Sequence, residues 1–264
     1  MTTRAHMEPT VPETTARAAR HAFDRSNPYR AAGDHIREVA SDLELAAMPE
    51  AAGAPPNAVM TLVTALQHAE GLSDREAAEA ARTRVDWKYV LHLPLHYPGF
   101  DVTALAGFRR RLMAHTAAHP CFERVLQWLG DLGLCADCRE SAPTTPRVLT
   151  EIATANRFPL LVQTMRLVLQ ALQDTAPEWL LATAPPRWQE WYLRPSWALH
   201  AADDLDHRLA LAQAVATDGF RLLDTLAAPE TPGTASSLAE LEVMREVWSW
   251  QFERHGDDVV WLAA

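Results

Sequence analysis

The feature that most constrains this sequence is the helical spacing of its apolar residues, which recurs along most of the chain and is interrupted by proline and glycine. Apolar residues at positions i, i+3, i+4 and i+7 share one face of a helix, whereas the strict alternation typical of strands is scarce here. The sequence therefore predicts a mainly α-helical protein. One such stripe consists of Val59, Leu62, Val63 and Leu66.

The clearest local prediction is a pair of helices joined by a tight turn over Gly71-Leu72-Ser73. Glycine adopts the left-handed backbone that ends many helices without steric cost. Ser73 and Glu76 have the spacing of a capping box, which satisfies free amides at the start of a helix. This is the layout of a helix-turn-helix. The predicted helices span 58–70, with Asn57 as N-cap, and 74–84, with Ser73 as N-cap.

Proline-containing and polar stretches divide the chain into three parts. We expect an N-terminal helical segment over 1–55, a multi-helix domain containing the helix-turn-helix over 56–134, and a second helical region over 147–264. The boundary is the irregular stretch Cys135–Pro146, and 228–236 is a loop. The other predicted helices span 101–116, 120–133, 160–174, 203–216, 219–227 and 238–254.

Charge and composition exclude several classes. The net charge is −10, and residues 149–264 hold eight arginines but sixteen acidic residues, so any surface that binds nucleic acid should lie in the first half. No apolar run approaches the roughly 20 residues that cross a bilayer, and the start lacks a signal peptide. Three cysteines do not suggest a disulfide framework, which favours a cytoplasmic protein with no membrane partner.

Three ordered blocks lie between Leu62 and Leu112, namely LQHAEGLSDREAA, DWKYVL and PGFDVTALAGFRRRL. Their order and spacing resemble the N-terminal, InsH-like domain of DDE-type bacterial insertion-sequence transposases. The likeness extends from about residue 12 to Trp261. It implies a mainly helical domain that acts on DNA.

Two departures from that family bear on catalysis. Thr144 stands where the family has the first of three metal-binding aspartates, and a neutral hydroxyl cannot replace a carboxylate as a Mg²⁺ ligand. The family's other two carboxylates lie beyond the point where this sequence stops, so we expect a chain truncated before the catalytic core is complete. The resemblance thus implies no catalytic residue, no metal and no cofactor here.

The candidate DNA contacts are basic residues inside the resembling blocks. Successive residues of a helix point about 100° apart, so the run 109–111 cannot face one partner as a whole. The alternative for each is a solvated face or an ion pair with a nearby acid, such as Asp74, Glu76 or Glu79. The candidates are Arg75, Arg82, Arg84, Lys88, Arg109, Arg110 and Arg111.

Three other patterns are weaker. Cys135 and Cys138 form a lone CxxC that could be half of a metal site, completed by His115, His119 or Cys121, but incidental thiols are the simpler interpretation. The spacing of His200, Asp203 and His207 allows a metal or acid–base site or merely an acidic helix start. A tryptophan-rich span could line a ligand pocket, although such residues more often belong to a core: Trp179, Trp188, Trp191 and Trp197.

Together these features lead to a transposase-derived DNA-binding protein without transposition catalysis, with duplex DNA as partner and a homodimer left open. Two alternatives remain at this point. One is a repurposed helical protein that binds or converts a small molecule through its second half, and the other is a non-functional transposase relic.

Overall fold

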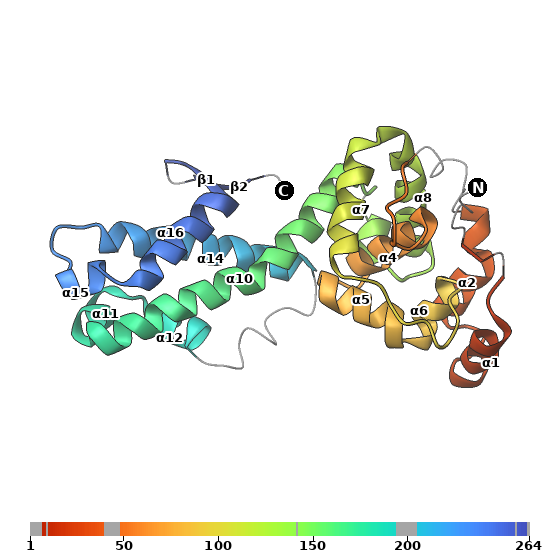
Figure 1. The fold of residues 1–264 in the computed structure, drawn as a ribbon, viewed down its shortest axis with the longest axis horizontal. Coiled ribbons are helices and arrows are strands. Elements are labelled where there is room, and N and C mark those ends of the chain that lie inside the picture. Colours follow the sequence, from red (N-terminus) through yellow and green to blue (C-terminus); the bar gives the residue numbers. More distant parts are fainter. Residues whose placement is uncertain are drawn as a thin grey trace. The chain divides into compact units, whose positions relative to one another are not determined.

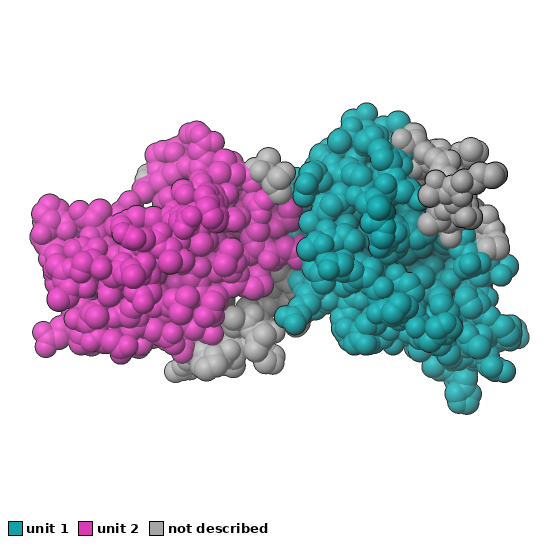
Figure 2. Space-filling view, in the orientation of Figure 1, with its two compact units in different colours: residues 1–152 teal, residues 153–264 magenta. Residues whose placement is uncertain are grey.

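The computed structural model describes residues 7–8, 10–39, 48–140, 142–193, 205–256 and 258–262. These residues are mostly helical, with one small two-stranded sheet, so the prediction of a mainly α protein is confirmed (Figure 1). The chain divides into two compact units, Met1–Ile152 and Ala153–Ala264 (Figure 2). Each unit has its own apolar core. Among the described residues, no helix is long and apolar enough to span a membrane.

Unit 1 is built around α4 (Asn57–Ala69), whose residues from Asn57 to His68 are all buried. A helix that is apolar on nearly every side is stable only when neighbours surround it, and α4 contacts α5, α7, α8 and α9. The other helices among the described residues of unit 1 are α1 (Glu13–Ala22), α2 (Pro28–Val39), α5 (Asp74–Thr83), α6 (Val85–Val90), α7 (Thr103–Ala114), η1 (Thr116–Ala118), α8 (His119–Asp131) and α9 (Ala136–Glu140).

The turn between α4 and α5 has the predicted geometry. Gly71 has φ +63°, its N–H donates to His68 O at 3.1 Å, and the N–H of Leu72 donates to Gln67 O at 2.9 Å, which is a Schellman motif. At the start of α5 both arms of the capping box with Ser73 and Glu76 are present. The two helices, their tight turn and the Ser73 N-cap are therefore confirmed.

The expected N-cap at Asn57 is wrong. Asn57 is the first residue of α4, and Pro56 occupies the N-cap position without a side-chain hydrogen bond. The buried Asn57 side chain instead donates from Nδ2 to Met48 O at 2.9 Å. A side-chain donor has satisfied a distant backbone carbonyl, which local capping preference does not anticipate.

Unit 2 begins inside α10 (Thr145–Thr175), the long helix whose first turns belong to unit 1. At the C-terminal end, β1 and β2 form an antiparallel hairpin in which Phe252 pairs with Trp261 and His255 with Asp258. After α10, the part of unit 2 that the structure describes contains α11 (Pro177–Thr183), α12 (Pro186–Tyr192), α14 (Leu205–Leu226), α15 (Gly233–Ser236), α16 (Ala239–Gln251), β1 (Phe252–His255) and β2 (Asp258–Trp261).

Several predicted boundaries in this half are corrected. The stretch 135–146 is not a plain break, because it contains α9, and α10 begins at Thr145 rather than near 160. The last helix ends at Gln251, and the hairpin follows it. The helices predicted at 203–216 and 219–227 are a single helix, α14, that continues through Gly219.

Gly219 lies inside α14 because another helix requires the space beside it. A Cβ atom at this position would overlap the indole ring of Trp248 on α16. The Trp248 Nε1 donates to Ala216 O at 3.0 Å, one turn before the glycine. Gly219 therefore leaves room for a buried tryptophan side chain, and it does not end the helix.

Candidate nucleic-acid interface

The outward face of α5 carries two of the predicted DNA contacts. Arg75, Glu79 and Arg82 are exposed and lie at positions i, i+4 and i+7, so they share one face over about 10 Å of helix. Together with the segment 98–102 they border an open depression of about 780 Å³. Its lining residues are Leu72, Arg75, Glu76, Ala78, Glu79, Ala80, Arg82, Thr83, Arg84, Pro98, Gly99, Phe100 and Val102.

The two arginines of this face differ in their partners. Arg82 donates from Nε and Nη2 to the Glu79 carboxylate at 3.0 and 2.6 Å. This exposed pair raises the pKa of Arg82 and lowers that of Glu79. The Arg75 side chain forms no hydrogen bond or ion pair within the part of the chain that the structure describes. Arg75 therefore offers a full set of guanidinium donors to a ligand.

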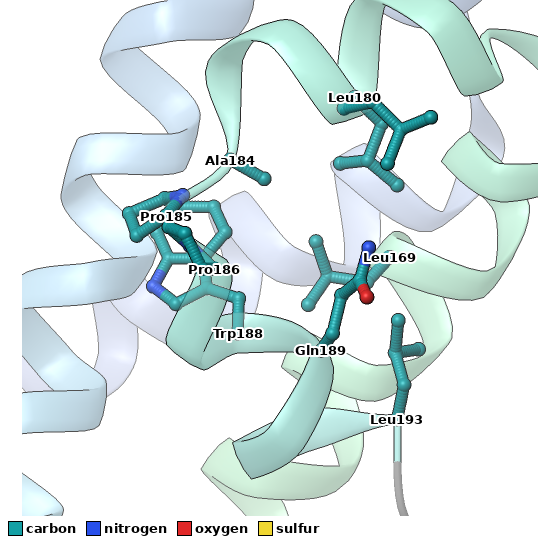
Figure 3. A pocket seen from close by; sticks show the side chains of 9 residues that line it. Leu169, Leu180, Ala184, Pro185, Pro186, Trp188, Gln189 and Leu193 are labelled. Atoms are coloured by element: carbon teal, nitrogen blue, oxygen red, sulfur yellow. The ribbon is translucent and has the colours of Figure 1, made fainter.

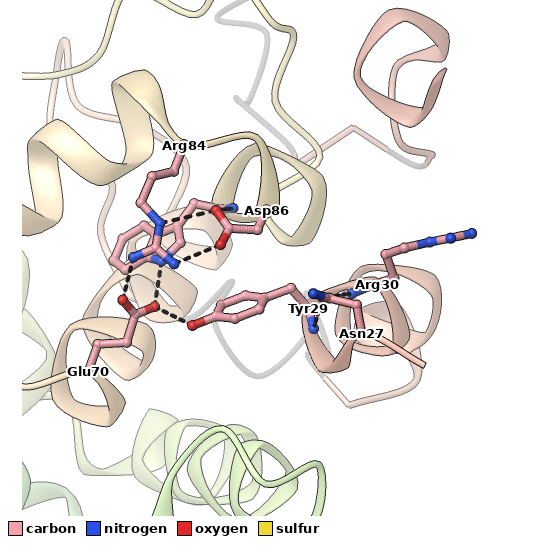
Figure 4. Close-up of polar contacts among 7 residues, drawn as sticks. Asn27, Tyr29, Arg30, Glu70, Arg84 and Asp86 are labelled. Carbon is pink, nitrogen blue, oxygen red and sulfur yellow. Dashed lines mark hydrogen bonds and ion pairs between the residues drawn. The ribbon is translucent and has the colours of Figure 1, made fainter. Parts of the chain in front are cut away.

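Arg84 also borders the depression, but its guanidinium is held by acids. It donates to Asp86 from Nε and Nη2 at 3.1 and 2.7 Å and forms an ion pair with Glu70 (Figure 4). Although burial lowers the pKa of Arg84, its hydrogen bonds and the charges of Asp86 and Glu70 raise it above the ordinary value. Arg84 is thus a permanent cation whose two charged neighbours neutralise it.

The Glu70 carboxylate joins three helices through the same network. It accepts from Tyr29 Oη of α2 and from Trp87 Nε1 of α6, each at 2.7 Å, and it lies at the C-terminal end of α4 (Figure 4). The Arg84 guanidinium lies over the Tyr29 and Trp87 rings, with its Cζ 5.6 and 5.5 Å from their centroids. The network positions α4, and with it α5, against α2.

Two further candidates are buried. The Lys88 amine donates to Leu95 O, and burial, with a smaller effect of the Arg82 charge, lowers its pKa. Arg109 of α7 forms a two-pronged ion pair with Asp74 at the start of α5, with both N–O distances 2.7 Å. Both side chains therefore connect segments within unit 1.

The remaining members of the arginine run point elsewhere. Arg110 is exposed and forms no ion pair or hydrogen bond among the described residues, whereas Arg111 is half-buried with its Cζ 5.9 Å from the Phe108 centroid. Burial lowers the pKa of Arg111, against the opposing effect of the Glu50 charge. The depression groups Arg75, Arg82 and Arg84, and none of Lys88 and Arg109–Arg111 lines it.

A comparison with protein families bears on this unit. Residues 17–111 match a transposase domain (DUF772). The matched residues begin within α1, include α2, α4, α5 and α6, and end within α7 at the arginine run. No curated protein and no solved structure matches the chain. The match supports a relationship to transposases for these residues, which include every candidate DNA contact.

Thr144, where the resemblance implies an aspartate, lies outside the matched residues 17–111. Thr144 is exposed and directly precedes α10, and its carbonyl accepts from Val148 N at 3.1 Å. The residues that follow Thr144 are therefore helical. Pro146 is the second residue of α10 and agrees with the helical start, since proline suits the first turn of a helix.

The cysteine motif differs from its sequence interpretation. Cys135 and Cys138 are joined by a disulfide, so the description as incidental thiols is wrong; residues three apart around a turn bring their Cα atoms to 5.3 Å. The expected partners His115 and His119 bind backbone carbonyls instead, those of Arg111 and Leu112. The histidine beside the motif is His68 of α4.

Of the remaining candidates, His200, Asp203 and Trp197 and the His207 side chain lie outside the described residues. Trp188 is a buried member of the unit 2 core, and Trp179 and Trp191 pack against that core. Sequence reasoning missed Tyr29, Glu70 and Trp87 as the network that positions α4 and α5. The DWKY block contained Trp87, but nothing local to it named the partners.

Proposed function

We propose that this chain is a transposase-derived DNA-binding protein that lacks transposition catalysis. The main observation in favour of this proposal is the exposed face of α5, which presents Arg75 and Arg82. The helix lies within the residues that match a transposase domain, and it begins with a complete capping box. In a helix-turn-helix the second helix enters the major groove and its N-terminal residues reach base edges. Arg75, in the first turn of α5, takes that place.

The predicted contacts then divide into two groups. Arg75, Arg82 and Arg110 are exposed and bind phosphates or bases directly. Arg84, Lys88 and Arg109 act indirectly, because each is held by groups within unit 1 and fixes the position of α5 or its neighbours. Arg111 is half-buried and contributes charge near the surface.

The lack of catalysis rests on Thr144. A two-metal transposase centre needs carboxylate oxygens to hold Mg²⁺, and an exposed threonine at the start of a helix supplies none. Purified protein with Mg²⁺ and supercoiled plasmid should therefore give no protein-dependent nicking. Nicking that survives nuclease-contamination controls contradicts this part of the proposal.

The binding test is fluorescence anisotropy with labelled duplexes at several salt concentrations, on the full chain. Two or three phosphate contacts give a log–log salt slope of about −2 to −3 and an affinity near the non-specific range, roughly 10⁻⁴–10⁻⁶ M. Replacing both Arg75 and Arg110 by alanine should remove most of the binding. The matched control is Arg221→Ala, an exposed arginine of α14 in unit 2.

The double variant keeps the buried ion pairs intact, so a loss of affinity is not a loss of fold. Unfolding midpoints by circular dichroism should agree among the wild type, the double variant and the control. If the double variant binds as tightly as the control, or the wild type does not bind at low salt, the DNA-binding proposal fails.

The small-molecule alternative has one observation in its favour. A pocket of about 250 Å³ in unit 2 is lined by Leu169, Leu180, Leu181, Ala184, Pro185, Pro186, Trp188, Gln189 and Leu193. Figure 3 shows the Gln189 amide facing the aliphatic side chains across this space. The pocket is smaller than usual ligand sites, about 300–1,000 Å³, and offers one amide for orientation. It therefore supports catalysis less well than α5 supports DNA binding.

A further inference from the structure

The CxxC motif lies beside a histidine that is distant in sequence. His68 is in the last turn of α4, Cys135 directly precedes α9 and Cys138 is within α9. One ligand atom from each of the three side chains lies within 4.8 Å of the other two. All three residues are buried, with 7, 2 and 1% of their surface exposed. Two thiols and an imidazole at this spacing are the donor set of a thiophilic metal site.

The backbone holds these side chains in place from both directions. The Schellman motif fixes the end of α4, where the His68 carbonyl accepts from Gly71 N at 3.1 Å. On the other side Gly133 has φ +76° and Leu134 N donates to Leu129 O at 2.8 Å, which fixes the turn leading to Cys135. Both turns are local, so the ligand positions do not depend on the metal.

Two further contacts shape the cysteine segment. Cys138 N donates to Cys135 Sγ at 3.3 Å, an interaction that also stabilises a thiolate. Gly130 of α8 allows the close approach of this segment, because a Cβ atom there would lie 3.0 Å from Arg139 N. The CxxC segment therefore packs closely against α8, and α9 also contacts α4.

We propose that the reduced chain binds a thiophilic metal ion through His68, Cys135 and Cys138. Three protein ligands leave one position of a tetrahedral Zn²⁺ ion for water or another small ligand, and they complete a trigonal set for Cu⁺. The bound ion joins the end of α4 to α9 across the core of unit 1. The proposal does not depend on DNA binding.

The disulfide form cannot serve as this ligand set. One phosphine reductant supplies two electrons that break the S–S bond, two protons from water complete the thiols, and the phosphine takes up the water oxygen. Binding of a divalent ion then forms two metal–sulfur bonds and one metal–nitrogen bond and releases the two thiol protons. The reduced chain should therefore bind the metal ion at this site, and the oxidised chain of the same sequence should not.

The test titrates Co²⁺ and then Zn²⁺ into the full chain under anaerobic conditions. The phosphine-reduced protein should take up one equivalent of Co²⁺ with thiolate-to-cobalt charge-transfer absorption, and Zn²⁺ should abolish that absorption stoichiometrically. A parallel titration with Cu⁺ against a chromogenic chelator ranks the two metals. Zn²⁺ should raise the Tm of the reduced chain and leave that of the oxidised chain unchanged.

Three variants assign the ligands. Cys138→Ser should weaken binding by at least roughly 100-fold and His68→Gln by at least roughly 10-fold, since each removes a direct metal bond. Cys121→Ser is the matched control, because Cys121 is a buried cysteine of the same core that lies outside the group of three. It should retain the absorption and the stoichiometry.

The oxidised wild-type chain keeps the test decisive even when a variant fails to fold. Absence of thiolate charge transfer in the reduced wild type overturns the proposal. So does equal binding by the oxidised chain, or loss of binding in folded Cys121→Ser with retention in folded His68→Gln. Uptake of one equivalent that needs both reduction and His68 supports it.

Discussion

The structural role of a single residue in this protein depends on which groups it contacts. Ser73 at the start of α5 caps the helix with its own side chain, and Gly219 inside α14 leaves room for a tryptophan from another helix. The first role can be seen in four consecutive residues, and the second only in the assembled core. A substitution at Ser73 should therefore affect stability through a lost hydrogen bond, and one at Gly219 through a steric clash.

Ser73→Ala removes one arm of the capping box and should lower the free energy of unfolding by about 1 kcal/mol. The measurement is urea denaturation followed by circular dichroism. Ser249→Ala is the control, because the exposed Ser249 hydroxyl of α16 donates only to Glu246 O and caps nothing. The control should stay within about 0.5 kcal/mol of the wild type, and an equal effect of both changes would show that the cap contributes little.

Two helical glycines should respond oppositely to alanine. Gly219→Ala introduces a Cβ atom into the Trp248 indole and should destabilise by about 2 kcal/mol, as overpacking does. Gly107→Ala on α7 meets only Arg111 Nη1 at 3.6 Å and should stabilise by about 0.5 kcal/mol through helix propensity. Thermal unfolding of both variants checks the pair, and stabilisation by Gly219→Ala is the result that contradicts the close packing.

At the scale of elements, an ion pair and two hydrogen bonds to a carboxylate connect helices that local turns cannot orient. Arg109 links α7 to the start of α5, and Glu70 links α4 to α2 and α6. The Arg109 and Asp74 side chains are 9 and 16% exposed, so this pair is shielded from water. The pair holds the start of α5, the helix that we propose to contact DNA, against α7.

Substitutions at two neighbouring arginines of α7 should therefore differ in their effect on stability. Arg109→Met takes the guanidinium away from the shielded Asp74 carboxylate and should destabilise by about 3 kcal/mol. Arg110→Met changes an exposed side chain and should alter stability by less than about 0.5 kcal/mol. Urea midpoints of both variants test this. If Arg110→Met is the more destabilising change, the assignment of buried and exposed roles is wrong.

At the scale of the whole molecule, the tyrosines of both units are buried or partly buried. The chain has four, Tyr29, Tyr89, Tyr97 and Tyr192. Burial raises the pKa of each, and nearby carboxylates add to this for all but Tyr97. Folding therefore favours the neutral phenol at all four positions.

The sign of the pH dependence follows from these raised pKa values. Their contribution to stability is fully present below pH about 10, the ordinary tyrosine value, and is lost as the pH rises above it. An alkaline titration should show tyrosinate absorbance appearing above pH about 10 and together with the loss of helical circular dichroism. Tyr192→Phe should reduce the alkaline loss of stability. Full titration near pH 10 in the folded chain contradicts the prediction.

The sequence by itself determined the features that depend on neighbouring residues. Apolar spacing predicted a mainly helical fold, and Gly71, Ser73 and Glu76 predicted the turn between α4 and α5, because capping and glycine conformations are local properties. The ordered blocks also indicated the transposase relationship, which the match at residues 17–111 supports. Which arginines are free could not be predicted, since Asp74 and Glu70 reach them only in the fold.

Tertiary structure alone decided the features that depend on contacts between distant segments. Gly219 continues a helix because Trp248 packs on it, and Asn57 is drawn from its capping role by the Met48 carbonyl. His68 reaches the CxxC segment because α4 ends where α9 begins to pack, 67 positions separating His68 from Cys135. A contact across such a distance is created by the packing of whole helices, and local periodicity carries no record of it.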